Sequence, residues 1–470
     1  MLVRSALYNG CGAQSASFPR THCQCLQAYN PAMDTPAAAT ATPASQRPLA
    51  ADVTLREVWA WSMYDFANSG YTTVVITAVF SAYFVGAVAG GAPWATFAWT
   101  FALSLSYLAV VLTAPLIGAW ADARAAKKRL LFASTIGCVL FTALLYFAAP
   151  GAVITALVLV ALSNYFFGVG ENLIAAFLPE LADSGAMGRV SGWGWSLGYV
   201  GGLTSLGVCL AYITAMQAAG HSAAQFIPVA MLITAALFAL ASAPTFAFLR
   251  ERALPQPGPM GAREAWSRVL STLRQSRRYA DLRRFLVCTL FYQAGIAAVI
   301  ALAAIYAQEA MRFTTQQTIV LVLVVNVTAA VGAFCFGYVQ DRIGHIRTVS
   351  LTLVGWIAMV LIAGFAEGVA SFWIAANLAG LCMGSSQAAG RAIVGYLAPP
   401  DRLAEFFGLW GLAVKSASVF GPLTYGAVTL LFEGNHRLGM FAVGIYFVIG
   451  LALLARVNVG RGREAALGPR

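Results

Sequence analysis

The segment GVGENLIAAFLPEL, from Gly168 to Leu181, decides the fold because it recurs in altered form 220 positions later. The second copy reads AAGRAIVGYLAPPD, from Ala388 to Asp401. When the two copies are superposed, Gly170 falls on Gly390, Pro179 on Pro399 and Glu171 on Arg391. The chain is therefore predicted to consist of two related halves, each with one charge at the same buried place and with opposite signs.

A second pair of segments follows nearly the same offset. GAWADARAAKKR begins at Gly118, and GYVQDRIGHIR begins at Gly337. Internal repeats of this kind mark transporters in which one half rocks against the other around a central site.

The composition predicts a membrane protein made of helices. Apolar residues make up 60% of the chain, charged residues 10%, and the mean hydropathy is +0.74, whereas a soluble domain is about 25% charged. A helix needs roughly 20 apolar residues to span a bilayer. The apolar runs are continuous rather than alternating, which argues against a β-barrel. Twelve spans are predicted: 59–85, 96–120, 129–149, 152–178, 192–216, 226–249, 284–307, 317–340, 348–366, 370–397, 406–431 and 437–457.

Basic residues predict the orientation. They gather in the loops after the second span (Arg124 to Arg129), after the eighth (Arg342 and Arg347) and between the halves, where nine arginines lie between positions 250 and 284. By the positive-inside rule these loops and both termini face the cytoplasm, and we expect the cell membrane as the location. The net charge of +11 follows from this topology, so it does not indicate nucleic-acid binding.

The expected organisation has five parts. Residues 1–52 form a disordered extension, 53–250 the first six-helix half, 251–283 a cytoplasmic linker, 284–458 the second half and 459–470 a cytoplasmic tail. In the linker, apolar residues from Trp266 to Leu273 fall on one helical face with arginines around them, which is typical of an amphipathic helix on a membrane surface.

The repeated G-x-x-x-D motif has a physical interpretation. Gly118 and Gly337 allow a neighbouring helix to approach closely, and Asp122 and Asp341 can accept from amides at a helix N-terminus or pair with a nearby arginine. The arginines nearest in sequence are Arg124 and Arg342. Such a cluster can latch the two halves in one state and release them in another. The motif resembles the signature of the major facilitator superfamily.

Three further segments resemble one branch of that superfamily. They are WAWSMYDFANSGYTTVV (Trp59–Val75), AFLPELADSGAMGRVSGWGWSLGYVGG (Ala176–Gly202) and GSSQAAGRAIVGYLAPPDRLAEFFGLWGLAVKSASVFGP (Gly384–Pro422). Together they are similar to the vacuole-effluxer-like branch, whose fungal members are similar to vacuolar amino-acid exporters. The resemblance covers about residues 55–457 and implies a twelve-helix fold and secondary transport.

The chain departs from the branch at two places. Ala175 stands where the family usually has Asn, and Gln293 and Ala294 stand where it tends to carry an Asn-Asp pair. The second departure removes a carboxylate from a cavity-lining span, which weakens the case for proton coupling there.

Four charges inside predicted spans are the candidate mechanism. Asp65 and Glu171 lie in the first half, and Arg391 and Lys415 lie in the second. A charge near the bilayer centre costs about 2.5–3.5 kcal/mol on insertion scales, so such groups face cavities or each other. Lysine otherwise occurs only at positions 127 and 128.

Three interpretations of these charges remain open. The acids and bases could form an inner gate, bind a zwitterion, or pair structurally within a half. Asn68, Gln293 and Gln387 could add neutral hydrogen bonds.

The sequence favours a transporter over other classes. No nucleophile–base arrangement, Walker loop or metal cluster is visible, so we expect no enzymatic activity, cofactor or metal. We expect a monomeric secondary transporter that moves a small polar solute, in the manner of an amino-acid exporter, with or without proton coupling. The alternatives are a sugar or drug permease of the same fold and a non-transporting receptor or scaffold.

The topology can be tested by labelling single cysteines in a cysteine-free background. We expect an impermeant thiol reagent to label Gly220→Cys and to miss Ala262→Cys in intact cells, because the basic loops stay inside. Permeabilised cells provide the control, in which both sites should react. Labelling of position 262 in intact cells would contradict the twelve-span topology.

Overall fold

A computed structural model describes residues 49–255, 267, 279–309, 311–313, 315–432 and 435–468. Within these residues, twelve helices are long and apolar enough to cross a membrane, which confirms the predicted all-α membrane fold with twelve spans. Most of the predicted N-terminal extension and the amphipathic segment around Trp266 lie outside the described residues. Leu49, which lies before the expected boundary at residue 52, pairs with Ala182 in an isolated bridge.

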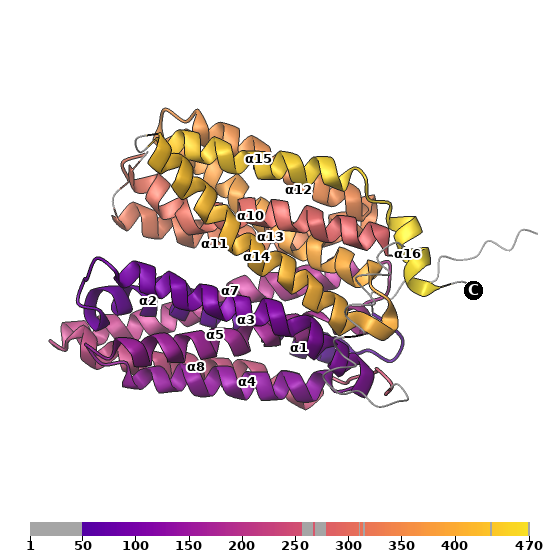
Figure 1. Cartoon of the computed structure of the whole chain (residues 1–470), viewed down its shortest axis with the longest axis horizontal. Coiled ribbons are helices and arrows are strands. Elements are labelled where there is room, and N and C mark those ends of the chain that lie inside the picture. The colour runs from indigo at the N-terminus through magenta and orange to yellow at the C-terminus, as the bar shows by residue number, and fades with distance from the viewer. Residues whose placement is uncertain are drawn as a thin grey trace, which may run out of the picture. The chain divides into compact units, whose positions relative to one another are not determined.

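Each half contributes six of the twelve spans (Figure 1). The first half consists of the segmented first span, described below, and of α3 (Ala95–Arg124), α4 (Lys127–Leu144), α5 (Val153–Ala175), the short α6 (Leu178–Leu181), α7 (Met187–Ala218) and α8 (Ala223–Phe248). The second half consists of α10 (Ala280–Glu309), α11 (Thr315–Ile343), α12 (His345–Gly364), α13 (Val369–Leu397), α14 (Leu403–Leu431) and α15 (His436–Leu454).

The first span is not a uniform α-helix. It begins as α1 (Leu55–Tyr71) and continues through two π-helical stretches, Thr72–Ala78 and Phe84–Val88, on either side of α2 (Phe80–Tyr83). Such stretches are rare and are found often at functional sites. The corresponding helix of the second half, α10, is α-helical from Ala280 to Glu309, so the two halves differ here.

The outer surface of the bundle is apolar. Large side chains such as Phe97, Ile154 and Leu240 are more than two-thirds exposed. A helix that is apolar on all sides is one that is surrounded by other helices or by lipid, so these faces are the lipid-contacting ones.

We call one end of the bundle the basic end. It is where α1, α7, α10 and α14 begin and α3, α5, α11 and α13 finish. It carries Lys128, Arg252, Arg342 and Arg347, and α16 (Val459–Leu467) lies there in Figure 1.

An acidic side chain near the start of each half binds the segment that follows the last helix of the same half. Glu57 in α1 accepts hydrogen bonds from the Arg250 amide (2.9 Å) and from the Arg252 guanidinium (2.7 and 2.9 Å), both of which follow the last helix of the first half. Asp281 in α10 accepts in the same way from the Asn458 amide (3.0 Å) and from Arg461 (2.6 Å), after the last helix of the second half.

These acid clasps form a third repeated feature, which the sequence analysis missed. The hydrogen bonds to Glu57 and Asp281 raise the pKa of Arg252 and of Arg461 above the ordinary value, so both arginines stay charged at any physiological pH. The segment expected to be a tail, 459–470, accordingly folds as α16 against the second half, with Gly462 and Ala466 buried.

The repeated glycines Gly170 and Gly390 each make room for a tyrosine of the same half. A Cβ added at Gly170 would lie 2.5 Å from the Tyr64 hydroxyl oxygen, and one added at Gly390 would lie 2.5 Å from the Tyr292 hydroxyl oxygen. The Tyr64 hydroxyl also bonds to Thr135 Oγ1 (2.8 Å), whereas the Tyr292 hydroxyl has no hydrogen-bond partner among the described residues.

This arrangement predicts a pattern in a pair of double-mutant cycles. Gly170→Ala and Gly390→Ala should each lower the free energy of unfolding by about 1–3 kcal/mol, because they overpack a tight contact. Adding Tyr64→Phe or Tyr292→Phe, respectively, should restore much of that loss. Tyr292→Phe alone should be neutral or stabilising, since it removes an unpartnered buried hydroxyl, while Tyr64→Phe alone should cost about 1 kcal/mol. Thermal unfolding in detergent measures all six variants, and additive effects within either pair would contradict the proposed contact.

Candidate functional site

The outer layer of the site consists of two carboxylates that cross from one half to the other at the basic end. Asp122, in the last turn of α3, accepts from the amides of Ala404 (3.1 Å) and Glu405 (2.9 Å) at the start of α14. Asp341, near the end of α11, accepts from the amides of Gly188 (3.0 Å) and Arg189 (3.2 Å) at the start of α7. Free amides and a positive partial charge at a helix N-terminus favour such carboxylates.

The two latches are therefore reciprocal, and each uses the amide alternative of the sequence analysis. A Cβ at Gly118 would overlap the Ala404 carbonyl, and one at Gly337 would lie 2.7 Å from the Gly188 carbonyl oxygen, so both glycines permit the close approach that was expected. The arginine that pairs with Asp341 is Arg189 of the opposite half (2.9 Å). The nearby residues Arg124 and Arg342 do not supply the hydrogen bonds described for either carboxylate.

A buried ion pair lies deeper in the bundle. Arg391 Nη1 of α13 donates to Asp65 Oδ2 of α1 (2.6 Å), while its Nε and Nη2 donate to the hydroxyl and carbonyl oxygens of Ser191 on α7 (3.1 and 2.8 Å). The guanidinium also packs against the rings of Trp61 and Trp195, at 4.7 and 5.4 Å from their centroids. The Arg391 side chain is only 3% exposed, and each of its three nitrogens donates to the opposite half.

A second ion pair is more accessible. Lys415 Nζ of α14 donates to Glu171 Oε2 of α5 (2.8 Å), and the Glu171 side chain is 27% exposed. The ammonium lies over the rings of Tyr107 and Phe167 at 5.3 and 5.4 Å. Both ion pairs join an acid of the first half to a base of the second half, so pairing within one half is not the arrangement found.

Gly194 on α7 gives the first ion pair its space. A Cβ at this position would lie 2.5 Å from Asp65 Oδ2 and 2.6 Å from Arg391 Nη2. The glycines of the fifth span were interpreted as positions of close helix packing, and Gly198 and Gly201 do face α1. The roles of Gly194 and Ser191 could not be predicted from the sequence, because they depend on which helices lie next to α7.

Of the three neutral candidate residues, two form a hydrogen bond with each other and the third has an oxygen without a partner. Gln293 on α10 donates to Gln387 on α13 (2.7 Å), within the second half. Asn68 is buried, and its Oδ1 has no hydrogen-bond partner among the described residues. The same holds for both amide atoms of Asn172, a residue that the sequence analysis did not select, which packs against Gly411 of the opposite half.

The repeated FLPEL segment connects the site to the basic end. Glu180 pairs with the buried Lys127 and accepts from the Arg252 amide (2.8 Å). Pro179 packs against Gly395 of the second half, where a Cβ would lie 3.0 Å from the proline ring. This segment therefore holds the end of α5, and hence Glu171, in place.

The comparisons with known proteins concern the chain as a whole. The family model described as "Vacuole effluxer Atg22 like" matches residues 85–467. The chain belongs to this family. A relative named "Uncharacterized MFS-type transporter YxiO", from Bacillus subtilis strain 168, is 28% identical over 409 residues, which cover 85% of this chain and 94% of the relative.

Fungal relatives and solved structures are also similar to this Atg22-like protein. Autophagy-related protein 22-1 of Aspergillus fumigatus is 25% identical over 336 residues; the match covers 64% of this chain and only 54% of the relative. The fucose transporter FucP in its outward conformation has a TM-score of 0.68 at 14% identity, and the human organic anion transporter MFSD10 has 0.66 at 16%. These matches cover 86% and 85% of this chain and 98% and 99% of those structures.

These findings confirm the class of protein. The chain is a multi-pass membrane transporter of the major facilitator superfamily with two six-helix halves, and it is not an enzyme. The two structural matches support the fold alone.

Gly194 provides a sharp test of the Asp65–Arg391 pair. Gly194→Ala should displace the ion pair and lower the free energy of unfolding by about 1–3 kcal/mol, as overpacking does. Gly207→Ala, on the same helix with no atom within 4 Å of the added Cβ, is the matched control and should be neutral or stabilising, because alanine is the better helix former. Thermal unfolding of both variants in detergent makes the comparison, and equal effects would contradict the steric role of Gly194.

Proposed function

We propose that this Atg22-like protein exports amino acids or similar zwitterions by alternating access, with the crossed ion pairs as its inner gate. The observation that carries the proposal is the division of charge: both acids, Asp65 and Glu171, belong to the first half, and both bases, Arg391 and Lys415, belong to the second. Together with the latches at Asp122 and Asp341, these pairs join the halves at the basic end, and we propose that they seal it.

The ion pairs make the sealed state depend on contact between the halves. Removing one partner of a buried ion pair costs about 3–5 kcal/mol, because the other charge is left unpaired. If the halves part at the basic end, all four charged groups lose their partners together. A ligand shifts such an equilibrium only by binding the two states differently, so a solute that supplies replacement charges is suited to drive the exchange.

The Glu171–Lys415 pair is the better place for a solute. It is more exposed than the Asp65–Arg391 pair, in which Ser191 and two tryptophans occupy the guanidinium. A zwitterion can place its ammonium at Glu171 and its carboxylate at Lys415, so that each charge exchanges one partner for another. Gln293, Gln387 and Asn68 are the neutral groups that we assign to the same solute path.

We place the basic end in the cytoplasm, on the positive-inside rule. The word "effluxer" in the family description supports an exporter; for this chain we propose a cell membrane and export from the cell.

A transport assay in proteoliposomes tests the proposal. Vesicles loaded with amino acids or dipeptides should release one class of these solutes faster than protein-free vesicles do. Comparing rates with and without an imposed proton gradient shows whether a proton is coupled. Release of sugars or lipophilic cations instead would favour the alternative permease, and release of no solute in any condition would favour a receptor or scaffold.

A charge series at the second ion pair tests the gate. Glu171→Gln should leave Lys415 without its partner and shift the protein toward the state open at the basic end. A cysteine placed between the halves there should become more reactive, and transport should slow. The swap Glu171→Lys with Lys415→Glu should partly restore transport, because the pair is rebuilt.

The structure also supplies a mismatched control for this series. Glu171→Arg combined with Arg391→Glu should fail to restore transport, since Arg391 faces Asp65 and not Glu171. If Glu171→Gln leaves cysteine reactivity unchanged and only weakens solute affinity, the residue belongs to a binding site and not to a gate.

A further inference from the structure

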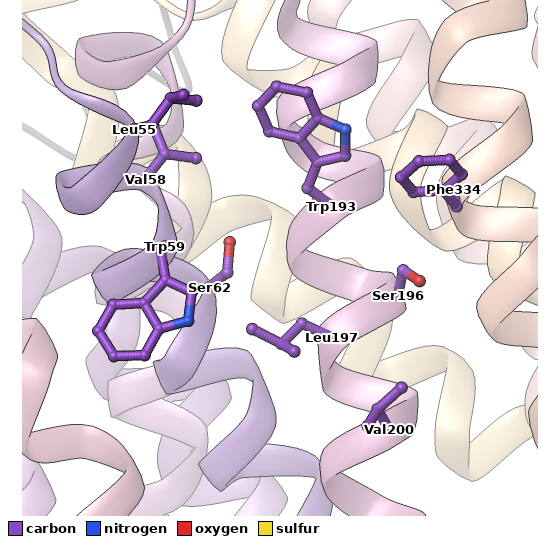
Figure 2. A pocket seen from close by; sticks show the side chains of 9 residues that line it. All are labelled: Leu55, Val58, Trp59, Ser62, Trp193, Ser196, Leu197, Val200 and Phe334. Carbon is purple, nitrogen blue, oxygen red and sulfur yellow. The ribbon is translucent and has the colours of Figure 1, made fainter.

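A groove on the side of the bundle is not used by the transport mechanism. It is a cavity of about 430 Å³ between α1, α7 and α11, near the basic end. Figure 2 shows the side chains that line it. The ones that matter here are Trp59, Ser62, Trp193, Leu197, Val200 and Phe334.

The groove opens toward lipid. Trp59, Val200 and Phe334 are each nearly half exposed, and neighbouring Leu55 is 66% exposed. Tryptophan is enriched where a membrane protein meets the lipid headgroup region, and two tryptophans face this groove from α1 and α7 (Figure 2).

One polar group in the groove is buried and unsatisfied. Ser62 is only 3% exposed, and its hydroxyl has no hydrogen-bond partner among the described residues. Figure 2 shows this hydroxyl directed into the space between α1 and α7. A serine within a helix commonly bonds to the carbonyl of the preceding turn. The hydroxyl is therefore a buried donor that lacks an acceptor, which a ligand bound in the groove can supply.

The end of the groove toward the basic end is positively charged. Arg189 lies one helical turn before Trp193 on α7, and Arg342 lies about two turns after Phe334 on α11, toward the basic end. Arg189 binds Asp341 through Nε, so its terminal nitrogens can still face an anion, and Arg342 is exposed. Two guanidinium groups and one carboxylate give this region a net positive charge.

The length of the stripe matches a phospholipid. From Arg189 to Val200 the helix rises about 16 Å at 1.5 Å per residue, close to the roughly 15 Å of one hydrocarbon leaflet. The order of chemistry along this distance is cation, indole, hydroxyl and aliphatic side chain. A phospholipid offers the complementary order of phosphate, interfacial glycerol, ester carbonyl and acyl chain.

We propose that the groove binds one anionic phospholipid from the leaflet at the basic end. Its phosphate lies at Arg189 and Arg342, an ester carbonyl accepts from the Ser62 hydroxyl, and an acyl chain follows Leu197 and Val200. Because the groove joins α1 and α7 of the first half to Phe334 of the second, the lipid bridges the halves. An occupied groove therefore favours the state in which the basic end is sealed, since only that state presents the whole site.

The test measures bound lipid and not transport, so it is independent of the substrate. The full-length protein is placed in nanodiscs of phosphatidylcholine with added phosphatidylglycerol, extracted, and examined by native mass spectrometry. We expect one retained phosphatidylglycerol in preference to phosphatidylcholine. Ser196→Trp, which fills the groove, should lose it, whereas Val208→Trp, at an exposed position farther along α7, should keep it.

Two further variants probe the contacts separately. Arg342→Gln should reduce the preference for phosphatidylglycerol, while the control Arg347→Gln, at an exposed position at the start of α12, should not. Wild-type protein should also prefer ester-linked over ether-linked phosphatidylglycerol, and Ser62→Ala should abolish that preference. Equal retention of the two headgroups by wild-type protein would mean ordinary annular contact only and would overturn the proposal, as would unchanged retention in Ser196→Trp.

Discussion

The structure depends on the rule that a charge inside a membrane protein must have a partner. Neither half pairs these four charges by itself, because the acids Asp65 and Glu171 lie on one side of the interface and the bases Arg391 and Lys415 on the other. The halves are therefore complementary in charge as well as in shape. Isolated charges at this depth are expensive, so any state that separates these partners must supply water or solute in their place. The need to satisfy four charges couples the arrangement of the halves to what occupies the space between them.

Several contacts occur twice, once in each half, as expected of a duplicated sequence. The same device, a carboxylate at the end of one helix that caps the start of a helix in the other half, appears once as Asp122 on α14 and once as Asp341 on α7. The clasps at Glu57 and Asp281 and the glycine–tyrosine contacts of Gly170 and Gly390 repeat in the same way. The copies differ in the first span, where π-helical stretches break the symmetry.

The fold was predictable from the sequence because hydropathy and a 220-residue repeat are local or periodic signals. The latch residues were also predictable, since Gly118, Asp122, Gly337 and Asp341 repeat in both copies. The pairing of the four charges was not, because it depends on which helix faces touch across the interface. Nothing in the sequence assigns Lys415 to Glu171 or Arg391 to Asp65. Ser191, Gly194 and Arg189 were missed for the same reason, as each acquires its role only from a helix in the opposite half.

In the proposed gate, the unpartnered carboxamide of Asn172 limits how long the sealed state lasts. In the described structure it is pressed against Gly411, one residue from the Glu171–Lys415 pair, without a hydrogen bond of its own. A buried polar group in that condition costs about 1–3 kcal/mol. Without such a cost, two ion pairs and two latches would stabilise the closed state strongly. The protein would then open slowly. The cost at Asn172 lowers the stability of the proposed closed state, and a transporter that cycles repeatedly needs a closed state that can open.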